Sequence, residues 1–275
     1  MGQIRVWRAS LTMNPLTRSL IEKAGYDNGF ENVIFSDENS LTLGSALHGS
    51  QLEILFKDSK YIVNIAKSDT PALTQEIFRS LDSRSPQIES SNSLNNENQL
   101  GLFLKRTSEL SLALPNQALN SFEVEFTKEL EKLPSDQQKN TDIYRMTRQR
   151  VGQQVYRTAL MMYWDNSCAV TGLSLSAALK ASHAKPWADC SSDDERLDVF
   201  NGFLLSANLD ALFDKFLISF DQRGALLIST RIDLDSQNKL GLDPSMKLRW
   251  VTLMHEKYLS YHRNIFNGFE EALKV

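Results

Sequence analysis

The feature of this sequence that most restricts its fold is a series of short segments between residues 168 and 220. CAVTG predicts a short strand and a turn, and ALKASHAKPWADC predicts a strand followed by a loop around one histidine. FNGFLLSANLDALFDKFLISF predicts a strand that continues into a short helix. The last three of these elements therefore have the order β, β, α.

Helical patterns flank this region. Residues 121–133 and 143–164 each repeat apolar side chains at three- and four-residue intervals, which predicts two amphipathic helices, the first of them ended by Pro134. After the β, β, α region, FLISFDQRGALLIS predicts a hairpin with its turn at DQRG, and a closing helix is expected from about Met246. We assign residues 121–275 to one domain.

The first part of the chain predicts a separate, smaller domain. Short alternating runs, such as LEILF followed by YIVNIA, mix with helical ones, which indicates a small α+β domain over residues 1–82. Residues 83–99, SRSPQIESSNSLNNENQ, are too polar to be ordered by burial, so residues 83–120 are interpreted as a linker and connecting segment. A length of 275 residues with 41% hydrophobic content is consistent with this α+β, two-domain organisation.

Composition excludes several classes of protein. No apolar run reaches the roughly eighteen residues of a membrane span, and the N-terminus has no signal-peptide pattern, so we expect a cytoplasmic protein with no membrane partner. The two cysteines, Cys168 and Cys190, form no CxxC pair, which argues against a disulfide framework and against a thiolate zinc site. Any metal must find other ligands.

The distribution of charge is more informative than its sum. A net charge of −4 does not indicate a nucleic-acid binder, but residues 143–164 contain no acidic side chain. We expect the basic residues of this segment, together with one lysine near a candidate histidine, to contact DNA phosphates. They are Arg145, Arg148, Arg150, Arg157 and Lys185. The alternative is that they only keep a helix soluble.

Two kinds of side chain could carry hydrolytic chemistry. His183 lies in SHAKP, where Pro186 ends the strand and holds the imidazole at the rim of a site, although an isolated histidine is usually structural. Asp210 and Asp214 stand four residues apart on the predicted helix, so they project from one face and are close enough to share a hard cation. The alternative interpretation of this pair is a solvated acidic helix face.

Taken together, the strings YRTALMMYWDNSCAVTG, LKASHAKPWADC and ERLDVFNGFLLSANLDALFDKFLISF resemble the His-Asn-His (HNH, ββα-metal) endonuclease domain of bacterial restriction and defence nucleases, over residues 145–229. The resemblance implies that His183 is the general base that deprotonates the attacking water. It implies that Asn201 holds the loop and orients the base. It also implies that Asp210 is a metal ligand and that Asp214, one turn later, is a second ligand.

Three positions depart from the family pattern. Asp210 stands where the family carries its last histidine, which makes the ligand set harder and favours Mg²⁺ or Mn²⁺ over Zn²⁺. Ser182, before the base, replaces a metal ligand of many members and leaves coordination partly to water and phosphate. Lys180 replaces a frequent glutamate.

The sequence therefore predicts a metal-dependent endonuclease for double-stranded DNA, serving restriction or phage defence. The alternatives are a DNA-binding protein of the same fold with weakened catalysis, and an effector nuclease that its N-terminal domain gates. Because one single-metal site cuts one strand, we also expect a homodimer. The main interpretation requires His183 and the two carboxylates to converge around one cation.

Overall fold

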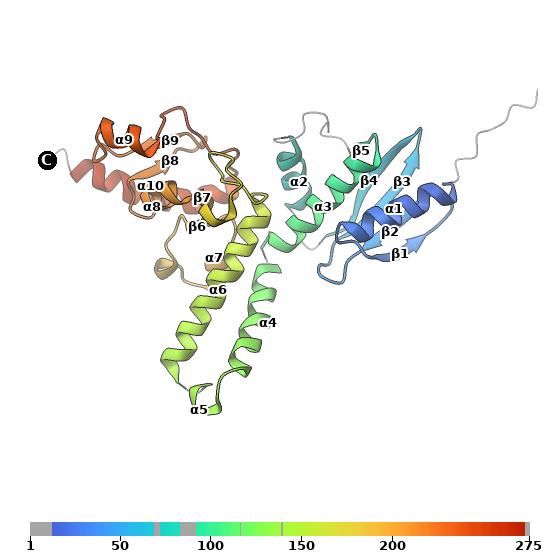
Figure 1. The fold of residues 1–275 in the computed structure, drawn as a ribbon, viewed down its shortest axis with the longest axis horizontal. Coiled ribbons are helices and arrows are strands. Elements are labelled where there is room, and N and C mark those ends of the chain that lie inside the picture. The colour runs from blue at the N-terminus through green and yellow to red at the C-terminus, as the bar shows by residue number, and fades with distance from the viewer. Residues whose placement is uncertain (1–12, 69–71, 83–91, 116, 139, 273–275) are drawn as a thin grey trace, which may run out of the picture. The chain divides into compact units, whose positions relative to one another are not determined.

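The computed structural model describes residues 13–68, 72–82, 92–115, 117–138 and 140–272. The chain forms two compact units, Met1–Ser111 and Leu112–Val275 (Figure 1). No helix among the described residues is long and apolar enough to cross a membrane.

The first unit is built on a five-stranded antiparallel sheet. Its strands follow the chain in the order β1 (Asn32–Ser36), β2 (Ser40–Gly44), β3 (Gln51–Lys57), β4 (Lys60–Lys67) and β5 (Ser93–Leu94). The predicted runs LEILF and YIVNIA form the β3–β4 hairpin, whose turn residues Asp58 and Ser59 both have positive φ, at 52° and 60°. The two-residue turn matches the twist of the hairpin.

Three helices accompany this sheet: α1 (Pro15–Asp27), α2 (Leu73–Asp82) and α3 (Glu97–Ala113). Helix α3 occupies residues that were predicted to belong to a linker and connecting segment. Residues 83–91 of that predicted segment lie outside the described residues. Leu100, Phe103, Leu104 and Leu110 recur at helical spacing and are buried, so most of α3 belongs to the core of the first unit. The polar composition of the preceding stretch obscured where this helix begins.

The second unit opens with a helical hairpin. Helices α4 (Gln117–Glu131) and α6 (Thr141–Tyr163) pack together and are joined through the short α5 (Ser135–Gln138) (Figure 1). Asn140 begins α6, because its side chain accepts hydrogen bonds from the backbone N–H groups of Asp142 and Ile143. The two predicted helices are thus present, with α4 starting four residues earlier than residue 121.

The β, β, α order is confirmed by β6 (Leu179–His183), β7 (Gly202–Ser206) and α8 (Ala207–Phe213). The two strands pair antiparallel, with His183 opposite Gly202. Helix α6 and helix α8 both pack against this hairpin. The long connection between the strands contains two short helical turns, η2 (Trp187–Asp189) and α7 (Asp193–Leu197), and the 3₁₀ turn η1 (Ser176–Ala178) precedes β6.

CAVTG forms a turn and no strand. The Gly172 N–H donates to the Cys168 carbonyl at 3.1 Å, and the N–H groups of Val170 and Thr171 point to the Cys168 sulfur at 3.5 and 3.4 Å. These N–H groups are therefore not available for a strand ladder. Gly172 has a φ of 70°, which suits glycine in this turn.

The remaining elements close the second unit. The predicted hairpin is present as β8 (Ile218–Phe220) and β9 (Leu226–Ile228), followed by α9 (Leu234–Leu240) and α10 (Leu253–Ala272). Helix α10 begins later than Met246 because the chain there runs beside β9: Leu226 N–H donates to the Met246 carbonyl at 2.9 Å. The core of this unit is aromatic, with Trp164, Phe203, Phe213 and Phe220 fully buried.

Candidate active site

His183, the last residue of β6, is held on three sides. Its ring stacks on Tyr156 of α6 with centroids 3.8 Å apart, and the Trp187 ring meets it edge-on at 5.7 Å. Its Nε2 lies 2.9 Å from the backbone carbonyl of Arg196. Because a carbonyl can only accept, Nε2 carries the proton and Nδ1 is the free acceptor of the neutral ring. Nδ1 makes no hydrogen bond within the described part of the chain.

The surroundings of His183 favour its neutral form. Burial lowers the pKa of the His183 imidazole to about 4, and the hydrogen bond to Arg196 only partly opposes this effect. At neutral pH the ring is therefore almost entirely deprotonated at Nδ1. It can accept a proton, although an imidazole with so low a pKa is a weak base.

Asn201 fixes the loop that carries the Arg196 carbonyl. The fully buried Asn201 side chain accepts from Lys185 N–H at 2.8 Å and donates to the Glu195 carbonyl at 2.8 Å. It thereby joins the start and the end of the β6–β7 connection. This geometry is what the predicted orienting role requires, and the catalytic role itself stays a prediction.

Three residues around His183 were not predicted from the sequence: Tyr156, Arg196 and Gly152. The Arg196 side chain donates to the Trp187 carbonyl at 3.2 Å and pairs with Asp193 at 3.0 Å, so it braces the loop beside the imidazole. A Cβ placed on Gly152 would lie 2.4 Å from the Trp187 ring. A glycine inside a helix costs about 1 kcal/mol, and this was the signal in the sequence that something approaches α6 closely there.

The carboxylates lie on the other helix. The Ser182 hydroxyl donates to Asp210 Oδ1, and Asp214 follows α8 one turn after Asp210, with its N–H bonded to the Asp210 carbonyl at 2.9 Å. Desolvation by neighbouring protein atoms, and then the negative charge of Asp210, raise the pKa of Asp214 although its side chain reaches the surface. A cation beside the pair would relieve this repulsion.

The cavity that His183 lines is not shared with Asp210 or Asp214. Neighbouring strand residues point to opposite faces of a sheet, so Ser182 faces α8 and Asp210, whereas His183 faces α6. The cavity of about 360 Å³ that His183 lines is bounded by α6, η1 and β6, and neither Asp210 nor Asp214 contributes to it. The expectation that His183 and the carboxylates converge did not take this alternation of side chains along a strand into account.

The donor set decides which metal could be held. Among the described residues, no group of three or more His, Cys, Asp or Glu side chains is arranged to hold a metal ion. Asp210 and Asp214 supply carboxylate oxygens alone, which fits Mg²⁺ or Mn²⁺, ions that are commonly held by one or two carboxylates with water and substrate phosphate. The pair does not fit a zinc site closed by protein nitrogen and sulfur ligands.

The five predicted DNA-contacting residues fall into two groups. Four are paired with carboxylates: Arg145 with Asp142, Arg148 with Asp193 and Glu123, Arg150 with Glu129, and Lys185 with Glu195. Arg157 instead donates to the backbone carbonyls of Leu179 and Ser176, at 2.7 and 3.1 Å, and has no carboxylate partner in the described part of the chain. It lines the cavity beside His183.

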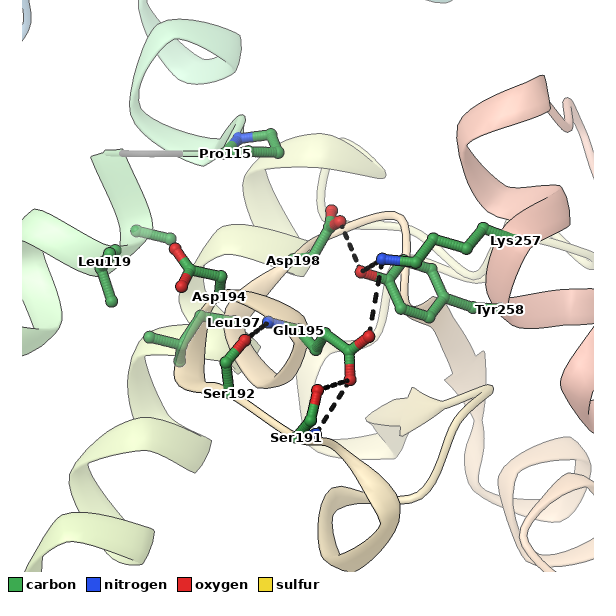
Figure 2. Close-up of a pocket in the computed structure, with 11 residues that line it drawn as sticks. Pro115, Leu119, Ser191, Ser192, Asp194, Glu195, Leu197, Asp198, Lys257 and Tyr258 are labelled. Atoms are coloured by element: carbon green, nitrogen blue, oxygen red, sulfur yellow. Dashed lines mark hydrogen bonds and ion pairs between the residues drawn. The ribbon is translucent and has the colours of Figure 1, made fainter.

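A second cavity, of about 380 Å³, lies where α10 meets the β6–β7 connection (Figure 2). Lys257 pairs with Glu195 at 3.5 Å, and the Tyr258 hydroxyl donates to Asp198 at 2.9 Å. Hydrogen bonds from Lys185 and from Ser191 lower the pKa of Glu195 to about 2. These contacts tie α10 to the loop that positions His183.

Part of the second unit matches a known protein family. Residues 168–221 match the model of a protein family described as HNH endonuclease. The matched span contains β6, β7, α8 and β8, and with them His183, Asn201, Asp210 and Asp214. No curated protein matches the chain.

Proposed function

The chain carries an HNH endonuclease domain, and on this premise we propose that it hydrolyses phosphodiester bonds of double-stranded DNA with one divalent metal ion. We further propose that it serves restriction or phage defence, as the resemblance to such nucleases suggests. The observation that carries the catalytic proposal is the hydrogen bond from His183 Nε2 to the Arg196 carbonyl, because it leaves Nδ1 of a neutral imidazole free to accept a proton.

In the proposed reaction His183 Nδ1 accepts a proton from a water molecule. The water oxygen forms a bond to phosphorus while the bond to the leaving oxygen breaks. The leaving oxygen takes a proton from solvent, and Nδ1 releases its proton to solvent. A divalent ion bound by Asp210 and Asp214 would neutralise the charge that develops on the phosphate and on the leaving oxygen. Asn201 acts as a positioning residue, since its side-chain hydrogen bonds hold the loop that orients the imidazole.

The separation of the two faces sets a condition on this reaction. Ser182 and His183 are consecutive, so their Cα atoms are about 3.8 Å apart at the end of β6 although their side chains point to opposite faces. A phosphodiester must therefore lie across this strand end to reach both the imidazole and the carboxylates. The proposal accordingly predicts that the imidazole and the carboxylates are both needed for cutting.

Incubation of the full chain with supercoiled plasmid tests the function. We expect nicked or linear DNA with Mg²⁺ or Mn²⁺ and none with EDTA, whereas an equal rate in EDTA would overturn the metal dependence. Cutting of both strands by a single-metal site needs two copies, so we propose a homodimer on DNA. Light scattering of the protein bound to a short duplex measures this stoichiometry.

A second candidate is a DNA-binding protein in which the nuclease fold has lost catalysis. Two observations favour it: the Ser182 hydroxyl occupies a lone pair of the Asp210 carboxylate, and an imidazole pKa of about 4 makes a weak proton acceptor. Binding of a labelled duplex without cutting in Mg²⁺, Mn²⁺ or both would support this candidate. Cutting that disappears in EDTA would exclude it.

A further inference from the structure

We propose that the cavity beside His183 is a subsite for a phosphate of the bound DNA strand and that Arg157 is the residue that binds this phosphate. The inference rests on the proposed function and deepens it. It specifies which of the basic side chains of the domain contacts the substrate, and on which face of the β6–β7 hairpin.

The cavity has the size and position that such a subsite needs. Its volume of about 360 Å³ lies in the range of sites for small ligands, enough for a phosphate and its sugar. Helix α6 supplies Gln153, Tyr156 and Arg157 to its wall, and η1 and β6 supply the rest. Because His183 is also part of the wall, a phosphate bound here lies next to the imidazole proposed as the base.

The charge of the lining selects an anion. Arg157 and Lys180 are the charged lining residues, and no Asp or Glu of the described part of the chain contributes to the wall. The similarly sized cavity in Figure 2 has the opposite character, with Asp194, Glu195 and Asp198 against one lysine, Lys257. A DNA backbone is therefore attracted to the first cavity and repelled from the second.

The state of Arg157 distinguishes it from the other basic residues. Three of the other basic residues form ion pairs that balance their charge. Arg148 pairs with Asp193. Arg150 pairs with Glu129 and Lys185 pairs with Glu195, each with a nitrogen–oxygen distance of 2.7 Å. The partners of Arg157 are two backbone carbonyls, which orient the guanidinium without cancelling its charge. A guanidinium has five N–H donors, so donors remain for a phosphate, and the group is already held in place.

The test measures DNA binding without cutting. A fluorescent duplex is titrated with the full chain in EDTA at several salt concentrations, for wild type, Arg157→Gln and Arg223→Gln. Arg223 is an exposed arginine in the β8–β9 turn, outside the cavity, so this variant matches the change in charge. We expect Arg157→Gln to weaken binding about five- to tenfold and to reduce the salt slope by about 1. We expect Arg223→Gln to stay within about twofold of wild type.

Because Arg157 also joins η1 to β6, a second measurement covers the case in which the variant does not fold. The side-chain NMR signals of His183 and Arg157 in the wild-type chain should shift when the unlabelled duplex is added in EDTA. Unchanged signals, or a folded Arg157→Gln variant with wild-type affinity, would overturn the subsite. If the wild type binds DNA through Arg157 but never cuts it, the subsite stands and the proposed hydrolysis fails. If Arg157→Gln binds DNA normally while the wild type cuts it, the proposed hydrolysis stands and the subsite fails.

Discussion

The two faces of the β6–β7 hairpin hold different chemistry. On the α6 face, His183 lies among aromatic rings beside Arg157, and its cavity is lined by no Asp or Glu that the structure describes. On the α8 face, Ser182 bonds to Asp210, and Asp214 lies one turn further on. A carboxylate beside the imidazole would raise its pKa and would repel a phosphate. In the proposed mechanism, the proton acceptor and the acidic pair therefore reach one substrate from opposite faces of the same strand end.

The largest effect is expected on the α6 face. His183→Ala removes the proposed proton acceptor, so single-turnover nicking of plasmid should fall by about 10²- to 10⁴-fold. DNA affinity in EDTA should change by less than about twofold, since the ring makes no ion pair to lose. Thermal unfolding of the variant separates this loss from misfolding. Nicking at the wild-type rate by the folded variant would remove His183 from the mechanism.

On the α8 face, Asp210→Asn should reduce cutting by at least about tenfold at low Mg²⁺, with partial recovery at high Mg²⁺, because a carboxylate ligand is lost. Without metal, the same variant should be as stable as wild type or slightly more stable, since the repulsion on Asp214 disappears. Asp235→Asn, which changes an exposed acid of α9, is the control. Equal cutting by all three proteins at every Mg²⁺ concentration would contradict a metal site on α8.

Gly152→Ala tests the packing of the α6 face without changing a charge. The added methyl group would lie 2.4 Å from the Trp187 ring, so we expect a loss of about 1–3 kcal/mol of stability and a several-fold slower cut as Trp187 moves from His183. Gly268→Ala in α10 meets no atom within 4 Å and should be neutral or stabilising by up to about 1 kcal/mol. Chemical denaturation followed by tryptophan fluorescence compares the two variants.

The smallest expected effect on the cutting rate concerns pH. With a pKa of about 4, His183 is already deprotonated at pH 6, so the cutting rate should lack the severalfold fall between pH 7.5 and 6 that an ordinary imidazole would give. A rate that follows a pKa near 6.5 would show that the ring is not buried as described.

The same pKa shifts determine how stability depends on pH. His183 and the buried His262 both have folded pKa values of about 4, below the unfolded value near 6.5. Between these values the unfolded chain binds more protons, so stability is highest above pH 6.5 and decreases as the pH falls towards 4. Melting temperatures from pH 7.5 to 4.5 should fall accordingly. The fall should be smaller in His183→Gln, which loses one of the two groups.

Local sequence patterns determined much of this protein. Helices α4 and α6, the β3–β4 and β8–β9 hairpins and the order of β6, β7 and α8 follow from periodicity and turn residues, which act over a few positions along the chain. The motifs around His183 and Asn201 likewise identified the HNH domain, which the family comparison supports. The placement of Ser182 and His183 on opposite faces of the hairpin can also be predicted from the sequence, because strand residues alternate between faces.

Only the tertiary structure decided which side chains have partners. Arg148 and Asp193 are 45 residues apart and form an ion pair, whereas Arg157 on the same helix bonds to two carbonyl groups and to no carboxylate among the described residues. Burial of His183 between Tyr156 and Trp187, which sets its pKa, also depends on segments distant in the chain. Pairing and desolvation are long-range properties, so composition and spacing could name the candidate residues but could not say which of them keep a free charge.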